Sequence, residues 1–211
     1  MRPEMLRIGG LVPFSTVDFP GRLSAVVFCQ GCPWRCRYCH NPHLQPRSGA
    51  VAGPRWAEVL EFLRDRRGFL DAVVFSGGEP TIQPQLQAAI ASVRGLGFQT
   101  GLHTAGIVPH TLRAVLPLVD WVGLDIKAPF DGRYAAITQA ASAARRAKAA
   151  LRAVRDSGVA YEIRTTWHPL WLDDQAKRDL NHAVAACGAR PTRWQKFRPE
   201  GCADPSLRAA A

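Results

Sequence analysis

The sequence predicts an α/β fold in which helices cover a parallel sheet. Short apolar or β-branched runs alternate with helical patterns along the chain, and parallel strands need such helical crossovers. The 211 residues are 47% hydrophobic and 21% charged, which excludes disorder and a short disulfide scaffold. At this length a hydrophobic core forms without disulfide staples. We therefore expect a single domain over residues 1–211.

The expected elements alternate along the chain. Six strands are expected as short buried runs, at 24–29, 71–76, 98–103, 121–126, 160–165 and 193–197. Five helices are expected between them, at 54–66, 84–94, 109–116, 138–156 and 173–186. Prolines suit the first turns of three helices, and glycines lie where three should end: Pro54, Pro84, Pro109, Gly95, Gly158 and Gly188. No element is assigned before residue 24, where glycine and proline are frequent.

Two of the expected strands share the tetrapeptide Ala-Val-Val-Phe, at 25–28 and 72–75. Buried parallel strands converge on such apolar runs, so the match is weak evidence of a duplication. Each run leads into a loop that contains glycine. Ligands of parallel α/β folds gather at the carboxyl ends of the strands, and both loops are therefore candidate sites.

The chain carries 27 Lys and Arg against 17 Asp and Glu, a formal net charge of +10 at pH 7. A large share of this excess lies in the expected helix 138–156, on Arg145, Arg146, Lys148, Arg152 and Arg155. The apolar stripe of the same helix leaves most of these cations on a solvated face, and consists of Ala144, Ala147, Leu151 and Val154. No aromatic residues interleave with the cations, which disfavours a nucleic-acid partner.

Two further patterns indicate the compartment. No apolar run reaches the roughly 18 residues of a membrane span, and residues 1–10 lack the apolar core of a signal peptide. We therefore expect a cytoplasmic protein with no membrane partner. Four of the six cysteines crowd into eleven residues, which in that compartment indicates metal binding rather than disulfides. Cys187 extends the apolar stripe of the expected helix 173–186, so it is expected to be a small buried residue.

The four clustered cysteines are Cys29, Cys32, Cys36 and Cys39. The last three form a C-x3-C-x2-C array in the loop after the first expected strand. Three thiolates on a short loop can hold three corners of a 4Fe-4S cluster and leave the fourth iron open. An open coordination position distinguishes a catalytic metal from a structural one.

Three alternatives use Cys29. A zinc site would pair Cys29 with Cys32 and Cys36 with Cys39, but only three residues separate the two pairs, fewer than in ribbon-type zinc sites. Cys29, Cys32 and Cys36 would give the reversed C-x2-C-x3-C spacing. Cys29 on the fourth iron would close the cluster and make it an electron-transfer centre. We favour Cys29 as the last residue of the buried strand 24–29, because it ends an unbroken apolar run.

The array resembles that of the radical S-adenosylmethionine superfamily. Tyr38 places an aromatic residue before the last cysteine, and Gly-Gly-Glu-Pro at 77–80 follows the second expected strand, in the order typical of that superfamily. The resemblance implies that Cys32, Cys36 and Cys39 bind a 4Fe-4S cluster whose open iron chelates S-adenosylmethionine. It also implies that Tyr38 flanks the adenine and that Gly77, Gly78 and Glu79 hold the methionine end.

A narrower resemblance, to the glycyl-radical-enzyme activating enzymes, covers nearly the whole chain. It is carried by residues 15–21, 30–33, 38–42, 125–127 and 162–166. The resemblance implies a partial (βα)6 TIM-like barrel, in agreement with the six expected strands. No cysteine lies between Cys39 and Gly77, so no inserted ferredoxin-like domain and only one cluster are expected.

Charged residues on two of the expected strands extend the candidate cofactor site. Asp125 and Lys127 share one face of a strand, as do Glu162 and Arg164. Inward charges at a barrel mouth are costly unless a polar ligand or each other satisfies them. Asp125, Lys127 and Arg164 are therefore candidate cofactor residues, with structural ion pairing as the alternative. The set is completed by His40, next to the last cysteine, and Thr104.

The resemblance implies a reaction and its partners. A reduced cluster passes one electron to S-adenosylmethionine, which releases methionine and a 5′-deoxyadenosyl radical that takes hydrogen from a glycine Cα of a partner enzyme. Within this group, the motifs resemble those of the members that activate anaerobic ribonucleoside-triphosphate reductase, which we expect to be the partner enzyme. An electron donor such as flavodoxin or ferredoxin is also implied, and no catalytic residue beyond the cluster and cofactor is assigned.

Two other functions remain open at this point. One is a small-molecule radical S-adenosylmethionine enzyme of deazapurine biosynthesis. The other is a closed iron-sulfur or zinc module that binds nucleic acid through the cationic helix. Hydrolase and nucleotide-triphosphatase functions lose support, since the sequence contains no Ser-His-Asp order, G-x-G-x-x-G loop or Walker loop.

Overall fold

The strands of the protein form a single sheet. The computed structural model describes residues 2–202 and 204–209, and in these residues seven strands follow each other in the order β1-β2-β3-β4-β5-β6-β7. β1 is antiparallel to β2, and every later pair of neighbours is parallel. The strands are β1 (Ile8–Ser15), β2 (Ser24–Cys29), β3 (Ala72–Gly77), β4 (Gln99–Thr104), β5 (Trp121–Asp125), β6 (Ala160–Trp167) and β7 (Thr192–Lys196).

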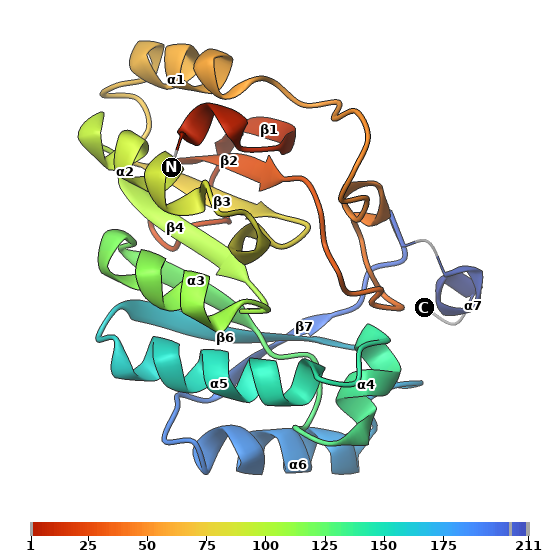
Figure 1. The fold of residues 1–211 in the computed structure, drawn as a ribbon. Coiled ribbons are helices and arrows are strands. Elements are labelled where there is room, and N and C mark those ends of the chain that lie inside the picture. The colour runs from red at the N-terminus through yellow and green to blue at the C-terminus, as the bar shows by residue number, and fades with distance from the viewer. Residues whose placement is uncertain (1, 203, 210–211) are drawn as a thin grey trace.

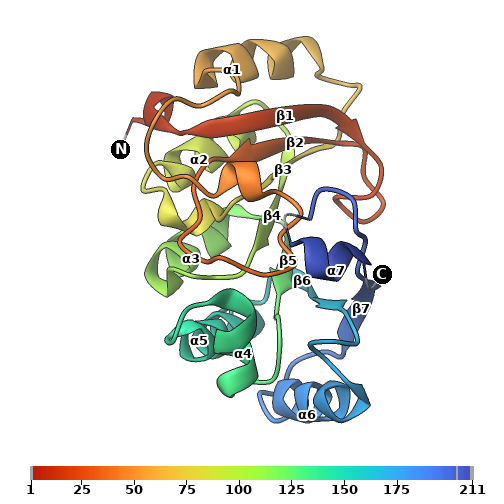
Figure 2. The same cartoon turned by 90° about the vertical axis from the view of Figure 1, so that its right-hand side faces the viewer.

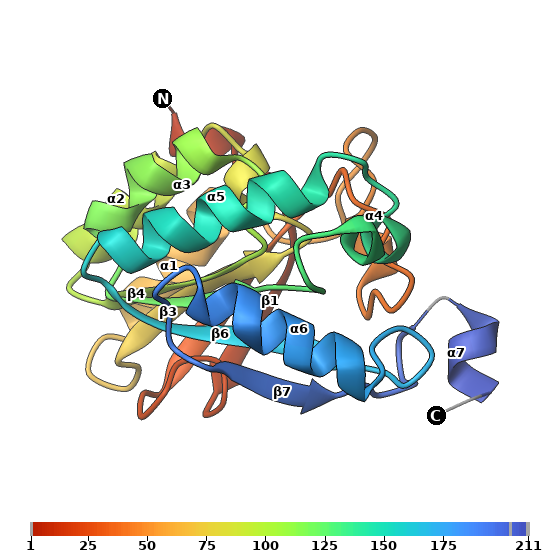
Figure 3. The same cartoon turned by 90° about the horizontal axis from the view of Figure 1, so that it is seen from below.

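Helices cover the outside of the curved sheet, as Figures 1 and 3 show. The helices of the described residues are α1 (Trp56–Asp65), α2 (Leu86–Gly95), α3 (Pro109–Val115), α4 (Gly132–Thr138), α5 (Ala143–Asp156), α6 (Asp174–Ala185) and α7 (Pro205–Ala209). Of these, α7 lies apart from the sheet, beyond its open end (Figure 1). Short 3-10 turns occur at Pro3–Met5, Pro42–Leu44, Pro80–Ile82 and Leu116–Leu118. The carboxyl ends of the parallel strands open toward the cysteine loop and α7, which Figure 2 views from the front. This is the partial barrel with outer helices that the sequence predicts.

The two faces of the sheet have separate cores. The larger core lies between the sheet and the helices, where Phe75, Leu102 and Leu124 are fully buried. The smaller core lies on the inner face and consists of Phe19, Val26, Ala72, Val74 and Trp121. Strand residues alternate between these two cores because successive side chains point to opposite faces.

The N-terminal segment, to which the sequence assigns no element, contains strand β1. Its pairing with β2 runs from Ile8 opposite Cys29 to Ser15 opposite Ser24, with irregularities that absorb its glycines and proline. The following loop turns inward and places the ring of Phe19 5.7 Å from that of Trp121. A side chain at Gly101 would meet Phe19 at 3.0 Å, so this glycine makes room for the ring. Phe19 therefore fills the inner face of the barrel below the candidate site.

The expected helix 138–156 is wrong at its start. Thr138 is instead the last residue of α4, Gln139 adopts a left-handed φ of 55°, and α5 begins at Ala143. Helix α4 was not predicted from the sequence; its first turn is capped by the Asp131 side chain, which accepts a hydrogen bond from the Arg133 N–H. Helix α7 was not predicted either. The other four helices and all six strands are confirmed, with ends that differ by at most two residues.

Two smaller expectations are also confirmed. Cys187 is buried, as expected for a small residue that extends the apolar stripe of α6. Arg145, Arg146, Lys148 and Arg152 are exposed on α5, opposite the buried side that contains Ala147, Leu151 and Val154. None of the helices in the described ranges is both long and apolar enough to cross a membrane.

The inner-face core yields a stability prediction. Replacing Phe19, which is 6% exposed, by Ala removes most of a buried ring, and we expect a loss of about 3–5 kcal/mol in the free energy of unfolding. Val17 in the same loop is 85% exposed, so Val17→Ala should change this free energy by less than about 0.5 kcal/mol. Urea titration of both variants checks the difference. Equal stabilities would show that Phe19 does not support the barrel.

Candidate active site

One pocket at the carboxyl ends of the parallel strands brings the predicted site residues together. All twelve of them line it: Cys32, Cys36, Cys39, Tyr38, His40, Gly77, Gly78, Glu79, Thr104, Asp125, Lys127 and Arg164. They come from the cysteine loop after β2, from the loop after β3, and from β4, β5, β6 and their ends. Residues more than 120 positions apart in sequence thus line the same pocket, because the carboxyl ends of parallel strands lie at the same end of the sheet.

The ends of β2 and β3 are joined tightly at the edge of this pocket. Cys29 is paired with Gly77, the Gly78 N–H donates to the Cys29 carbonyl at 2.9 Å, and the Glu79 N–H donates to the Gly31 carbonyl at 2.9 Å. Gly77 has a φ of +119°, and a side chain there would come within 2.4 Å of the Cys29 backbone. Only glycine fits this position, so the Gly-Gly-Glu loop is locked against the start of the cysteine loop.

The cysteine loop is held from behind by α4. The Arg35 N–H donates to the Thr138 carbonyl at 3.0 Å, and the Arg37 N–H donates to the Ile137 carbonyl at 3.1 Å. The ring of Trp34 meets Tyr134 edge-on at 5.9 Å. The end of α4 therefore supports the chain between the cysteines at three points.

Cys32, Cys36 and Cys39 are free, partly exposed thiols. Burial raises the pKa of Cys32 to about 12, with a further contribution from the Glu79 charge, and raises the pKa of Cys36 to about 11. In the described residues, no three His, Cys, Asp or Glu side chains converge on a single metal ion. A 4Fe-4S cluster does not require such convergence, because each cysteine binds a different iron. The donor set therefore fits a cluster better than a single ion.

Cys29 is not among the residues that line the pocket. It is fully buried in the core between the sheet and the helices, on the face opposite Val26. Strand alternation places Val27 and Cys29 on the same, outer face of β2. Burial raises the pKa of the Cys29 thiol, so its neutral form is favoured there. This position agrees with Cys29 as the last residue of a buried strand.

Glu79 is a buried carboxylate that organises the pocket wall. Its side chain is 1% exposed and accepts hydrogen bonds from the N–H and hydroxyl of Thr81, from the Thr104 hydroxyl at 2.5 Å and from the Ala105 N–H at 2.9 Å. Burial nevertheless raises the pKa of Glu79. No Lys, Arg or His in the described residues forms an ion pair with it. The carboxylate thus leaves an uncompensated negative charge beside the pocket, which a cationic group of a ligand would balance.

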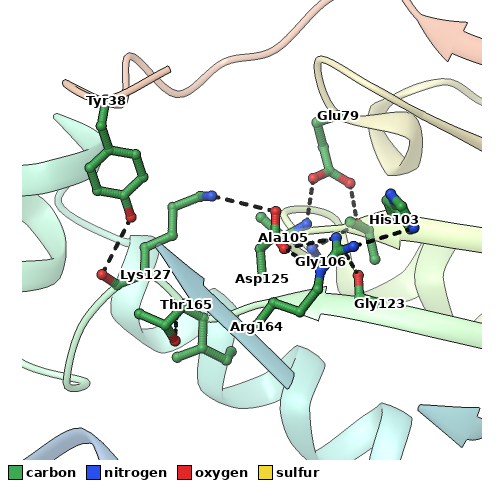
Figure 4. A network of polar contacts seen from close by, with 12 residues as sticks. Tyr38, Glu79, His103, Ala105, Gly106, Gly123, Asp125, Lys127, Arg164 and Thr165 are labelled. Atoms are coloured by element: carbon green, nitrogen blue, oxygen red, sulfur yellow. Dashed lines mark hydrogen bonds and ion pairs between the residues drawn. The ribbon is translucent and has the colours of Figure 1, made fainter. Parts of the chain in front are cut away.

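Asp125, Lys127 and Arg164 form a second charged group, shown in Figure 4. Asp125 accepts from Arg164 Nη2 at 2.9 Å and lies 3.7 Å from the Lys127 ammonium. The structural ion pairing considered for these residues is therefore present. It is incomplete, because two cations share one carboxylate, and the surplus positive charge faces the pocket. Glu162 takes no part, since it pairs with Arg193 at 3.1 Å.

The C-terminal segment also supports the cysteine loop. His40 Nε2 lies 2.9 Å from the Arg198 carbonyl, and its ring stacks on Phe197 at 5.6 Å. Arg37 forms an ion pair with Asp204 at 2.7 Å. His40 is thus held from outside while it lines the pocket. Nothing in the sequence motifs indicates these contacts, because they join segments more than 150 residues apart.

His103 is the main pocket residue that the sequence analysis missed. Its Nε2 donates to the Asp18 carbonyl at 2.8 Å, and the Arg164 guanidinium lies 3.3 Å from the same nitrogen. The alternation of side chains along β4 could have identified it, because His103 points to the inner face of the sheet near the carboxyl end of the strand. The other lining residues not predicted are Trp34, Asn41, Gln45, Ser76, Ala105, Ile107 and Thr166.

The burial of His103 yields a pH prediction. Burial and the Arg164 charge lower the pKa of His103 to about 4, whereas an unfolded histidine titrates near 6.5. The unfolded chain then binds more protons between these values, so stability falls as the pH drops from about 6.5 toward 4. From pH 7 to pH 5 this loss is about 2 kcal/mol. His103→Gln removes this titrating group. Urea unfolding at pH 7 and pH 5 should therefore show a smaller fall in the free energy of unfolding for the variant than for the wild type. Equal losses would contradict a neutral, buried His103.

Comparisons with known proteins agree with this geometry. The model of the radical SAM superfamily matches residues 26–182. A Methanocaldococcus jannaschii protein named as a glycyl-radical enzyme activating enzyme is 31% identical over 206 residues, covering 93% of this chain and 82% of that protein. The pyruvate formate-lyase-activating enzyme of Clostridium pasteurianum is 35% identical over 177 residues, covering 81% of this chain and 72% of that enzyme.

Solved structures share the fold at low sequence identity. QueE from Escherichia coli superposes with a TM-score of 0.52 at 15% identity, over 90% of this chain and 93% of that one. Streptococcus suis SuiB, solved bound to S-adenosylmethionine, gives a TM-score of 0.62 at 14% identity, over 80% of this chain and 39% of that one. The radical SAM superfamily uses a 4Fe-4S cluster with S-adenosylmethionine, which confirms the two expected cofactors. Because the family model spans most of its length and close relatives share nearly all of it, the chain belongs to the radical SAM superfamily and, within it, to the glycyl-radical-enzyme activating enzymes.

Proposed function

We propose that the pocket residues bind the two cofactors and direct a radical to the glycine of anaerobic ribonucleoside-triphosphate reductase. The observation that carries the site is the arrangement of three free cysteines, the Gly-Gly-Glu loop and two charged groups around one pocket that Cys29 does not line. Cys32, Cys36 and Cys39 would hold the cluster. Once reduced and bound to S-adenosylmethionine, the cluster supplies the reductive cleavage that yields the radical.

The pocket charges fit a zwitterionic ligand. S-adenosylmethionine carries an amino group, a carboxylate and a sulfonium. The uncompensated Glu79 and the nearby backbone of Gly77 and Gly78 suit the amino group, and the surplus cation of Lys127 and Arg164 suits the carboxylate. The buried ring of Tyr38, which contacts Lys127, would flank the adenine. His40 and Thr104 complete the wall, and the protein's task is to bind, orient and exclude water.

The reductase is proposed as the partner on the sequence resemblance of residues 15–21, 38–42 and 125–127. The structure supports a function for the first of these segments, because it supplies Phe19 to the barrel interior and the Asp18 carbonyl to His103. We further propose flavodoxin or ferredoxin as the electron donor and the cytoplasm as the compartment. Six free thiols suit a reducing compartment. The relatives are named for activation of proteins, which disfavours the deazapurine alternative.

A partner assay tests this proposal. The reduced protein with S-adenosylmethionine should give a glycyl radical signal in electron paramagnetic resonance when mixed with anaerobic ribonucleoside-triphosphate reductase. Pyruvate formate-lyase, the partner in the names of two relatives, serves as the comparison. A signal on pyruvate formate-lyase alone would reject the reductase and keep the activase function.

Cysteine variants test the cluster assignment. Cys32→Ala, Cys36→Ala and Cys39→Ala should each abolish S-adenosylmethionine cleavage, because each removes one iron ligand. Cys29→Ala should keep close to one 4Fe-4S cluster and retain cleavage, since Cys29 is fully buried and does not line the pocket. Iron content and methionine release measure both effects. Loss of the cluster in Cys29→Ala, with its fold intact by circular dichroism, would revive the four-cysteine site.

Charge-removing variants test the cofactor pocket. Lys127→Met and Arg164→Met keep an apolar stem and remove a partly buried cation. We expect ten- to a hundredfold weaker S-adenosylmethionine binding, corresponding to roughly 1.5–3 kcal/mol for a lost charged hydrogen bond, with unchanged iron content. Equilibrium binding is the readout. If both variants bound S-adenosylmethionine with wild-type affinity, Lys127 and Arg164 would serve only as ion-pair partners of Asp125.

A further inference from the structure

A surface groove adjoins the support of the cysteine loop. It lies between α4 and α5, and its floor is formed by Phe130, Gly132, Ala135, Ala144 and Ala149. Arg145, Lys148 and Arg152 line one side of it. They stand at spacings of three and four residues along α5 and therefore form one stripe along the helix. The groove thus combines a small apolar floor with a cationic rim.

The cations of the rim lack partners. No carboxylate in the described part of the chain forms an ion pair with Arg145, Lys148 or Arg152. The one acid that lines this groove, Asp131, is occupied by Arg133, which also binds Asp179. Three like charges on one helix face repel one another and destabilise the helix slightly. An acidic protein surface would relieve that repulsion, and charge complementarity of this kind speeds docking.

Aromatic side chains of α4 and its neighbours link the groove to the cysteine loop. Phe130 lines it, and the ring of Phe130 stacks on that of Tyr134 at 6.3 Å. Tyr134 is fully buried and meets Trp34 at 5.9 Å, and Trp34 lies between Cys32 and Cys36 and lines the active-site pocket. Figure 1 shows α4 beside the start of α5 and below the cysteine loop, which it contacts through Ile137 and Thr138. Packed aromatic side chains therefore connect the floor of the groove with the loop proposed to hold the cluster, through ring separations of 6.3 and 5.9 Å.

We propose that this α4–α5 groove is the docking surface for an acidic one-electron carrier protein that reduces the cluster. The inference rests on the proposed function, because it assumes a cluster on Cys32, Cys36 and Cys39. In the step itself the docked carrier is oxidised by one electron and the cluster is reduced by one, with no bond formed or broken. Arg145, Lys148 and Arg152 position the carrier and do not touch the reacting groups.

The test reverses the rim charges. In Arg145→Glu/Lys148→Glu/Arg152→Glu we expect the Kd for oxidised flavodoxin to rise at least tenfold at low salt, and the rate of cluster reduction by reduced flavodoxin to fall by a similar factor. The loss should shrink as salt is added. Arg146 is left unchanged because it donates to the Ile107 carbonyl at 2.9 Å, next to the pocket. Flavodoxin binding is read by titration and needs no turnover.

A matched control carries the same change of charge elsewhere. Arg64, Arg66 and Arg67 are exposed at the end of α1, on a different face from α5 (Figure 1), and Arg64→Glu/Arg66→Glu/Arg67→Glu should bind flavodoxin like wild type. Reduction by photoreduced 5-deazariboflavin, a small reductant that needs no docking surface, should be equal in all three proteins. Equal loss of flavodoxin binding in both triple variants would overturn the proposal, since only net charge would then matter.

Other occupants of the groove give different outcomes. If the rim variant kept flavodoxin binding but formed less glycyl radical with the chemical reductant, the groove would belong to the partner enzyme and the proposal would be wrong. If the rim variant kept flavodoxin binding but lost a salt-sensitive binding to a DNA duplex that the wild type shows, a nucleic acid would be the occupant. The proposal would then also be wrong. Failure of the wild type to cleave S-adenosylmethionine with the chemical reductant would instead refute the proposed function, and the flavodoxin titration would still report on the groove.

Discussion

The close contact between the carboxyl ends of β2 and β3 is the constraint on which the site depends. The parallel pairing continues past Cys29 and Gly77 into the loops, through the hydrogen bonds of Gly78 and Glu79 to Cys29 and Gly31. Because backbone fills the space where a side chain at Gly77 or Gly78 would lie, the two loops cannot separate or slide without breaking the sheet edge. The cysteine loop and the Gly-Gly-Glu loop are therefore placed by one register, and the pocket between them is preformed.

The second requirement of the site is a balance of buried charges that the protein alone does not complete. Glu79 is held by neutral donors, whereas Asp125 is shared by Lys127 and Arg164. The pocket thus holds an excess of negative charge at one wall and of positive charge at another. Buried charges are costly without partners, and a zwitterionic ligand would supply both. The supports of the cysteine loop, α4 on one side and the C-terminal segment on the other, keep its residues in place around these charges.

The sequence predicts the chemistry of this site better than its surroundings. The cysteine array and the Gly-Gly-Glu loop are local patterns whose spacing reflects their chemistry, so all twelve predicted residues meet in one pocket. The two Ala-Val-Val-Phe runs show the limit. In the sheet the two runs are shifted by one residue relative to each other, so Val26 lies opposite Val74. Phe28 therefore packs on the inner face of the sheet, whereas Phe75 packs on the outer face. Corresponding side chains of the two identical tetrapeptides thus point to opposite faces of the sheet, because tertiary packing sets the register of the two strands.

Elements that depend on distant contacts were the ones missed. β1 forms despite its glycines and proline because β2 offers it an unpaired edge. The expected helix 138–156 breaks at Gln139, where the end of α4 contacts the cysteine loop, and the alanine-rich local sequence does not reveal this contact. The contacts of His40 with Arg198 and of Arg37 with Asp204 likewise join the two ends of the chain.

We propose that Cys32, Cys36 and Cys39 leave one iron of the cluster open to S-adenosylmethionine in the pocket. Electron paramagnetic resonance of the reduced protein, recorded before and after addition of S-adenosylmethionine, tests it most directly. A cluster with an open iron should change its spectrum when the amino and carboxylate groups of the ligand bind that iron. An identical spectrum at saturating S-adenosylmethionine would mean a closed cluster, and would contradict the account.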